Sequence, residues 1–281
     1  MSSEPPLLGP VDIVSPGAIA VERRDRIRSR VESDGFASVT ELSGALGVSV
    51  VTVRSDLDAL AGEGVLQRVR GGAVPRGGRG GERSFEEGLA AAADEKRAIA
   101  HEAAASVLAG ESVILDVGST TAAIATALVE RDELRGVTVI TNGLSIALAL
   151  EAAIPRFTVI VTGGTLRPLQ HSLVEPLAGE MFARIRADVA FIGCTGVHPE
   201  AGVTNVNLPE AGLKRTMLSA AGRRIVVADS SKLGVIDLGR VAGLDSFDRL
   251  ITGSAAGSAI VAELEESGLA VTRCATPSGT P

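Results

Sequence analysis

Apolar residues recur three and four positions apart between residues 50 and 60, and this spacing predicts a short helix with one buried face. The residues expected to face a small core are Val50, Val53, Leu57 and Leu60. The opposite side of the same helix carries Thr52, Arg54 and Ser55. Hydroxyl and guanidinium groups suit base edges and phosphates, so this face has the chemistry of a DNA-reading helix.

Two further helices are predicted ahead of this one. Ile27 and Val31 stand four apart in an Arg-rich segment and indicate the first helix. Ser38-Val-Thr-Glu41 has the form of a capping box, in which each side chain accepts from a free backbone N–H at the other residue. It predicts the start of the second helix, with Leu42 and Leu46 facing inward.

A tight turn over Gly47–Ser49 joins the second and third helices, and Ser49 is expected to cap the third. Two helices joined by so short a turn, the second with polar residues, are typical of a helix-turn-helix motif. A basic hairpin over residues 65–69 completes a winged helix-turn-helix, assigned to residues 20–74. The residues predicted to contact DNA are Ser38, Thr40, Ser49, Val51, Thr52, Arg54, Ser55, Arg68 and Arg70.

Three segments lack the apolar periodicity of folded elements. Residues 1–19 hold several Pro and Ser and are expected to form a disordered leader. Residues 75–83 are rich in Gly and are expected to link two domains. Residues 275–281 are assigned to a tail.

Short β-branched runs alternate with Ala- and Leu-rich stretches from residue 84 to residue 274. The runs that predict strands are 113–117, 137–141, 157–161, 189–192, 225–228 and 250–252. Such alternation predicts an open α/β domain with a parallel sheet covered on both faces. Small polar or Gly-bearing loops follow nearly every run, and open sheets of this kind bind ligands there.

Composition narrows the function without identifying it. The chain has six Phe, no Trp and no Tyr, which argues against stacking on single-stranded nucleic acid. Cys194, Cys274 and the three His lack the spacing of metal ligands, so no metal or other cofactor is expected. No signal peptide or membrane-length apolar run is visible, which favours a cytoplasmic protein.

Charge is distributed unevenly along the chain. The formal net charge is -7, yet Ala20–Arg79 contains ten Arg and eight acidic residues, a local excess of +2. This asymmetry fits a DNA-reading head on an acidic body.

Two ordered sets of residues carry a resemblance to a known family. The N-terminal set is Glu41-Leu42, Leu46–Ser49, Thr52–Arg54, Asp56-Leu57, Leu60, Gly64 and Gly71–Ala73. The C-terminal set is Asp116–Thr121, Thr141-Asn142, Gly163-Gly164, Leu166-Arg167, Asp188–Gly193, Thr204, Glu210-Ala211, Lys214-Arg215 and Ala228–Lys232. From about Val21 onward the chain resembles the DeoR family of bacterial transcriptional regulators. The resemblance implies a C-terminal domain, residues 84–274, of the sugar-phosphate isomerase and CoA-transferase type.

The resemblance also implies that this domain binds a phosphorylated sugar and relays that event to the DNA-binding domain. The residues expected to bind the effector are Asp116, Gly118, Ser119, Thr120, Thr121, Thr141, Asn142, Gly163, Gly164, Gly193, Thr195, Glu210, Lys214, Asp229, Ser230 and Lys232. At Gly118–Thr121 a Gly lets the backbone approach a phosphate, and hydroxyls and helix N–H groups donate to it.

The chain departs from the family pattern at three places. Ser55 stands where a second Arg is usual, so the helix has one guanidinium fewer to contact DNA. Ser119 replaces the commoner Thr and keeps the hydroxyl. Cys194-Thr195 replaces a more usual small pair, which changes the side chains that this loop offers to a ligand.

Plainer explanations stay open for several of these residues. Glu210 and Lys214 stand four apart, as in a surface ion pair on a helix. Thr141–Gly143 and Gly163-Gly164 have the composition of turns. Asp229–Lys232 could support acid–base chemistry, which gives an alternative in which a sugar-phosphate isomerase-like enzyme carries a DNA-binding head.

The sequence therefore predicts a regulator of transcription and not an enzyme, with no catalytic residues. We expect a repressor of a carbohydrate-catabolism operon that binds double-stranded operator DNA and a phosphorylated sugar. Because one small head reads one half-site, a homo-oligomer, dimer or tetramer, is expected. A winged helix used only for protein contacts is the remaining alternative.

Overall fold

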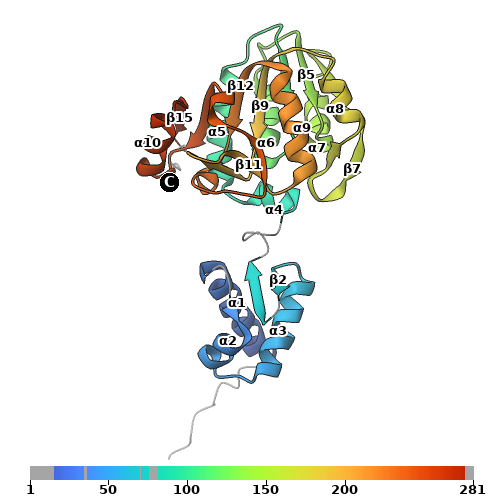
Figure 1. Cartoon of the computed structure of the whole chain (residues 1–281). Helices are drawn as coiled ribbons and strands as arrows, with labels where there is room; N and C mark the ends of the chain where they lie inside the picture. The colour runs from blue at the N-terminus through green and yellow to red at the C-terminus, as the bar shows by residue number, and fades with distance from the viewer. Residues whose placement is uncertain (1–15, 35–36, 70, 76–81, 276–281) are drawn as a thin grey trace, which may run out of the picture. The chain divides into compact units, whose positions relative to one another are not determined.

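The chain divides into two compact units, Met1–Gly81 and Glu82–Pro281, here called the N-terminal and C-terminal units. A computed structural model describes residues 16–34, 37–69, 71–75 and 82–275 (Figure 1). Each unit is considered by itself.

The N-terminal unit packs three helices against a small antiparallel sheet. Its elements are α1 (Pro16–Asp34), β1 (Ala37–Ser38), α2 (Val39–Leu46), α3 (Val50–Gly62), β2 (Leu66–Val69) and β3 (Gly72–Pro75). The strand order is β1-β3-β2, so the hairpin predicted as a wing gains a third, very short strand. The predicted winged helix-turn-helix is confirmed.

The local signals that start and stop these helices act as predicted. Ser38 and Glu41 form both halves of the capping box at the start of α2. Gly47 ends α2 with φ of 65°, a left-handed conformation that Gly adopts without strain. The Ser49 hydroxyl accepts from the backbone N–H of Thr52 at 3.1 Å and so caps α3.

The core of the N-terminal unit lies where α1, α2 and α3 meet the sheet. Its buried apolar residues are Ile27, Val31, Ala37, Val39, Leu42, Val53, Leu57, Leu60, Leu66 and Ala73. The prediction that Val50 belongs to this core is wrong, because 38% of Val50 is exposed. Val50 lies on the first turn of α3, at the margin of the buried stripe, where water reaches it.

A buried carboxylate joins α1 to α3. Asp56 is only 2% exposed and accepts hydrogen bonds from Arg23 Nε at 2.6 Å and from Arg24 Nε at 3.2 Å. Burial by itself raises the pKa of Asp56. The two guanidinium groups lower the pKa by more than burial raises it, so the pKa lies below its usual range.

Two elements of the N-terminal unit extend beyond the domain boundaries predicted from the sequence. Helix α1 begins at Pro16, inside the segment 1–19 assigned to a leader. Strand β3 ends at Pro75, inside the segment 75–83 assigned to a linker. Arg70, the second predicted wing contact, lies outside the described residues.

The C-terminal unit alternates strands and helices along the chain. Its first half contains α4 (Phe85–Ala90), α5 (Ala93–Ala105), β4 (Ser112–Leu115), α6 (Ser119–Glu130), β5 (Val137–Thr141), α7 (Leu144–Leu150), η1 (Glu151–Ala153), β6 (Phe157–Val161), β7 (Thr165–Arg167), η2 (Pro168–Gln170), β8 (Ser172–Val174) and α8 (Leu177–Phe182). Its second half contains β9 (Ala187–Gly193), β10 (Gly196–His198), β11 (Gly202–Asn205), α9 (Leu208–Ser219), β12 (Ala221–Val227), η3 (Ser230–Lys232), β13 (Gly239–Ala242), η4 (Leu244–Ser246), β14 (Arg249–Gly253), α10 (Ser258–Glu266) and β15 (Val271–Cys274).

Within the described part of the chain, seven strands form one parallel sheet in the order β15-β14-β12-β9-β4-β5-β6. Strand β4 illustrates how both faces are covered, since its residues point alternately to the two sides. Val113 and Leu115 join a core with α5, α6 and α7, whereas Ile114 joins a second core with α8 and α9. The predicted open α/β architecture is confirmed.

The sequence pattern does not predict three groups of strands. The edge strand β15, the three-stranded antiparallel sheet β10-β11-β13 and the hairpin β7–β8 are short and lack long β-branched runs. The antiparallel sheet and the hairpin both follow strands of the main sheet in the chain, and they build the surroundings of the site described below.

Replacing Asp56 by Ala is expected to destabilise the N-terminal unit by about 1–3 kcal/mol, since two guanidinium groups lose a charged acceptor. Asp58→Ala is the matched control on the same helix, because its ion pair with Arg68 is exposed and contributes at most about 1 kcal/mol. Thermal unfolding of both variants, followed by circular dichroism, measures the difference. Because its pKa is lowered on folding, Asp56 contributes stability at neutral pH that is lost as the pH falls below about 4. Equal losses in the two variants would contradict this role.

Candidate functional site

The order of the strands in the main sheet reverses at β4 and β9. From β4 the chain proceeds outward through β5 to β6 and then returns to β9, on the other side of β4. In open α/β sheets, ligands bind beside the carboxyl ends of the strands at such a reversal. We call the carboxyl ends of β4, β5, β6, β9 and β12, with the loops that follow them, the carboxyl rim.

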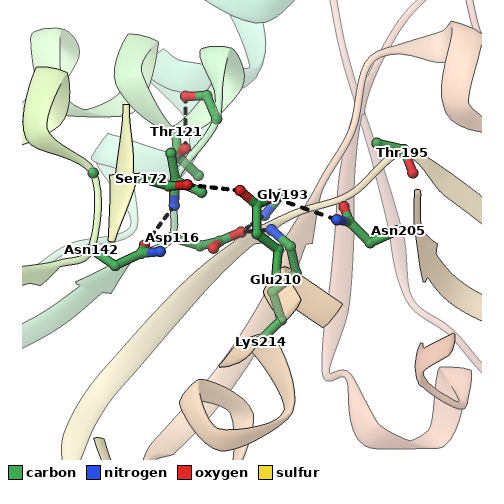
Figure 2. A network of polar contacts seen from close by, with 12 residues as sticks. Asp116, Thr121, Asn142, Ser172, Gly193, Thr195, Asn205, Glu210 and Lys214 are labelled. Atoms are coloured by element: carbon green, nitrogen blue, oxygen red, sulfur yellow. Dashed lines mark hydrogen bonds and ion pairs between the residues drawn. The ribbon is translucent and has the colours of Figure 1, made fainter. Parts of the chain in front are cut away.

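A buried ion pair lies at this reversal of the strand order. Asp116, which follows β4, pairs through Oδ2 with Nζ of Lys214 from α9 and accepts a hydrogen bond from the Gly193 N–H at 3.0 Å (Figure 2). Asp116 and Lys214 are 1% and 2% exposed. Burial raises the pKa of Asp116 to about 6, and the nearby ammonium and amide limit the rise.

A second carboxylate, Glu210, lies one turn earlier on α9. Its Oε1 accepts from Ser172 Oγ at 2.9 Å, and its Oε2 lies 3.5 Å from Asn205 Nδ2 (Figure 2). Oε1 also pairs with Arg167. The spacing of Glu210 and Lys214 suggests a surface ion pair, and this interpretation is wrong. Both side chains are buried, and each has partners on other elements.

The loop Gly118–Thr121 opens α6 as predicted. Ser119 is half-buried, whereas Thr120 and Thr121 are buried. The Thr121 hydroxyl donates to the Gly118 carbonyl at 2.9 Å, so this hydroxyl is already engaged within its own turn (Figure 2). The hydroxyls of Ser119 and Thr120 and the first N–H groups of α6 are the groups left to meet a ligand.

Thr141 and Asn142 brace the rim from within. Thr141 Oγ1 accepts from the Gly143 N–H at 3.0 Å. Asn142 accepts from the Val117 N–H at 3.0 Å and donates to the Leu173 carbonyl at 3.1 Å, which ties the loop after β4 to β8. Both residues are fully buried, and these contacts agree with turn and bracing roles.

Two other loops of the rim have a packing reason for their composition. Gly164 has a φ of 137°, and a Cβ there would lie 2.1 Å from the Val174 carbonyl oxygen, so β8 requires Gly at this position. Gly163 lies against Leu177 of α8. Thr195 is half-buried and its hydroxyl accepts from the Val206 N–H at 2.8 Å.

The loop after β12 pairs with a cation of α5. Asp229 caps η3 through the Ser231 N–H and pairs with Nζ of Lys96 on α5 at 3.8 Å, and among the described residues it has no ion pair with Lys232. Ser230 donates to Glu95 through its N–H at 2.9 Å and its hydroxyl at 3.0 Å. Lys232 is half-buried, and within the described residues its ammonium has no ion-pair or hydrogen-bond partner.

Sequence reasoning missed five polar residues that complete this network. They are Glu95, Lys96, Arg167, Ser172 and Asn205. Among these five residues, only Arg167 belongs to the family pattern found in the sequence, so only Arg167 could be detected from the sequence. The others depend on the hairpin β7–β8, the sheet β10-β11-β13 and α5, whose positions the sequence pattern does not fix.

The predicted DNA-reading face lies on the exposed side of α3. Arg54, Ser55 and Val51 are exposed, and Thr52 is half-buried with its hydroxyl 2.8 Å from Ser49 Oγ. Thr40 on α2 is also exposed.

Three further predicted DNA contacts already have partners within the unit. The hydroxyls of Ser38 and Ser49 cap α2 and α3. Arg68 of the wing pairs with Asp58 at 3.1 Å.

The described residues also bear on two other features, a metal site and a membrane-spanning helix. No three His, Cys, Asp or Glu side chains come together as metal ligands among the residues that the structure describes. None of the helices in the described ranges has the length and apolar character needed to span a membrane.

Comparison with known families assigns both units. The DeoR-like helix-turn-helix domain matches residues 23–75, and the DeoR C terminal sensor domain matches residues 91–254. The chain belongs to the DeoR family. As a DeoR-family member it is a DNA-binding regulator of transcription, which confirms the main functional prediction.

Curated relatives of this DeoR-family chain are aligned over nearly their full length. The HTH-type transcriptional regulator GolR of Listeria innocua is 33% identical, covering 89% of this chain and 97% of the relative. The HTH-type transcriptional regulator GlpR of Haloferax volcanii is 34% identical, covering 90% and 97%. The glycerol-3-phosphate regulon repressor of Escherichia coli is 27% identical, covering 80% and 88%.

Solved structures resemble the DeoR-family chain only remotely. The full-length sorbitol operon regulator SorC from Klebsiella pneumoniae has a TM-score of 0.39 and 11% identity, covering 87% of this chain and 98% of its own. The ribose 5-phosphate isomerase A from Methanocaldococcus jannaschii has a TM-score of 0.36 and 20% identity, covering 49% and 52%.

Replacing Lys214 by Met is expected to destabilise the C-terminal unit by about 3–5 kcal/mol, because the buried carboxylate of Asp116 loses its cation. Adding Asp116→Asn, which keeps an acceptor for the Gly193 N–H, is expected to recover part of that loss. Lys232→Met is the matched control, since that half-buried Lys has no ion pair among the described residues, and its cost is expected below about 1 kcal/mol. Urea unfolding by circular dichroism measures all three, because the chain has no Trp or Tyr to report by fluorescence. A double variant no more stable than Lys214→Met would refute the pairing.

Proposed function

We propose that this DeoR-family regulator is a repressor of a carbohydrate-catabolism operon, and that a phosphorylated sugar bound at the carboxyl rim lowers its affinity for operator DNA. The observation that carries the proposal is the convergence of carboxylates and cations at the carboxyl rim, where β4 and β9 end beside a Gly-Ser helix N-terminus. Relatives named as glycerol-3-phosphate regulon repressors support an anionic, phosphorylated effector.

The proposed DNA contacts are assigned by what each group can offer. Arg54 and Ser55, with Val51 and Thr52, lie on the face of α3 that would enter the major groove and read base edges. Ser38, Thr40 and Ser49, at or near helix N-termini, would contact phosphates. Arg68 and Arg70 of the wing would do the same.

The proposed effector contacts divide by chemistry. Gly118, Ser119 and the N-terminus of α6 would hold the phosphate, with Lys232 as the cation within reach of the same rim. Carboxylate, ammonium and hydroxyl groups would bind sugar hydroxyls, namely Asp116, Glu210, Lys214, Asp229, Ser230 and Thr195. Thr120, Thr121, Thr141, Asn142, Gly163, Gly164 and Gly193 would shape the pocket.

We further propose that the rim binds without turnover. Asp116 is held by Lys214, and Asp229 by Ser231 and Lys96, so neither carboxylate is free to move a proton between carbons of a sugar. The protein would act in the cytoplasm. It would form a homo-oligomer, because each N-terminal unit would read one half-site.

Fluorescence anisotropy of the protein on its own upstream DNA, titrated with a panel of sugar phosphates, tests this function. Salt-sensitive binding that one phosphorylated sugar weakens is the expected result. Absence of binding to duplex DNA at low salt would reject the repressor. Turnover of ribose 5-phosphate that Asp229→Asn abolishes would favour the enzyme alternative.

Arg54→Ala is expected to weaken operator binding by about 1–3 kcal/mol if the guanidinium reads a base edge. Arg186→Ala, an exposed Arg of the C-terminal unit, removes the same charge and is expected to leave the affinity within the error of the measurement. Unchanged operator affinity in Arg54→Ala would remove this residue from the reading face.

Arg68→Gln is expected to weaken binding to all DNA sequences alike and to reduce the salt slope of log Kobs by about 1, because a phosphate contact releases about one counterion. Anisotropy titrations from low to moderate salt measure the slope. A loss confined to the operator sequence would instead mean that Arg68 contacts a base.

A further inference from the structure

The first described segment of the C-terminal unit, Glu82–Ala91, is anchored on the carboxyl rim. It includes α4, follows residues 76–81 in the chain and is here called the tether (Figure 1). Its first residue, Glu82, pairs through Oε2 with Nη2 of Arg167. The carbonyl of its second residue, Arg83, accepts from Nε2 of Gln170. The hairpin that carries Arg167 therefore holds the N-terminal end of the tether.

Arg167 has a second carboxylate partner, and that partner belongs to the proposed effector site. Its Nη1 pairs with Oε1 of Glu210, the same oxygen that Ser172 reaches. The three side chains are largely buried, with exposures of 18% for Arg167, 14% for Glu82 and 6% for Glu210. One guanidinium thus bridges the rim and the tether, and the fork of a guanidinium suits two acceptors at once.

The rest of the tether contacts two further loops of the rim. Lys96 donates to the carbonyls of Gly88 at 2.5 Å and Ala91 at 2.6 Å, and it is the cation beside Asp229. A Cβ at Gly88 would lie 3.2 Å from the hydroxyl oxygen of Ser119. The tether therefore lies against the very loops that would hold a phosphorylated ligand.

We propose that Arg167 is the positioning residue that couples effector binding to the DNA-binding unit: an anionic effector competes with Glu82 for its guanidinium and so releases the tether. This inference rests on the proposed function, because it needs an anionic effector at the rim. A phosphate attracts a guanidinium more strongly than a single carboxylate does, since it offers more charge and more acceptor oxygens.

The competition supplies the energy difference that regulation needs. A ligand shifts a conformational equilibrium only by its differential affinity for the two states. Here the anchored tether denies Arg167 to the effector, whereas the released tether makes it available. The effector then binds the released state more tightly, and by linkage the anchored state binds operator DNA more tightly.

Without any ligand, Glu82→Gln in the full-length protein tests the anchor. Amide hydrogen exchange across residues 82–91 is expected to quicken by about tenfold, and operator affinity to fall by about fivefold. The matched control is Asp94→Asn, which removes an exposed carboxylate paired with Arg97 on α5 and is expected to change neither quantity. Exchange and operator affinity unchanged in Glu82→Gln would overturn the proposal.

With ligand, ribose 5-phosphate, fructose 6-phosphate and glycerol 3-phosphate serve as probes in calorimetry and in the operator assay. A probe that binds the native protein is expected to bind Glu82→Gln at least as tightly. The fold-change in operator affinity that the probe causes is expected to be at least about five times smaller in Glu82→Gln than in the native protein. Glu82→Asp, which keeps the carboxylate, is expected to retain the native response. A native response in Glu82→Gln would overturn the coupling. If no probe binds the native protein, the proposed effector fails, and the ligand-free arm alone decides whether Glu82 anchors the tether.

Discussion

The ion pair between Asp116 and Lys214 sets the geometry of the carboxyl rim. The two residues lie 98 positions apart in the chain, and their contact joins the end of β4 to α9, while the Gly193 N–H brings in the end of β9. Removing two charges from water costs several kcal/mol per ion, so the pair persists only with close contact and a further hydrogen bond. Both conditions are met here. The loops after β4 and β9 are therefore fixed relative to the helix that also carries Glu210.

The same principle extends around the rim, where carboxylates and cations alternate. Asp229 has Lys96, Asp116 has Lys214, and Glu210 shares Arg167 with Glu82. The ammonium of Lys232 is a cation at this rim without such a partner among the described residues. An incoming anion therefore meets a surface whose charges already compensate one another. It gains affinity from the N–H groups of α6 and from Lys232, or by taking a cation from an existing carboxylate.

How far the sequence predicts this protein depends on the range of the interactions. Local signals are reliable: the capping box at Ser38, the left-handed Gly47 and the apolar stripe of Val53, Leu57 and Leu60 all appear as expected. Long-range partners are not readable. Glu210 and Lys214 look like a surface pair by spacing, and only the tertiary structure directs one to Arg167 and the other to Asp116. Likewise, the positions of Thr121 and Asn142 are predictable, but the backbone groups that engage their side chains are not.

The covalent path between the units narrows how a bound sugar could influence DNA binding. Within one chain, the covalent connection from the rim to the N-terminal unit runs through the segment that begins at Glu82. That segment is held by a buried guanidinium, and breaking such a contact carries an energy comparable to a typical allosteric coupling of about 1–3 kcal/mol. The contact is thus strong enough to matter and weak enough to be exchanged for a ligand. An oligomer would multiply the same exchange, since each chain contributes one such contact to the balance between its two states.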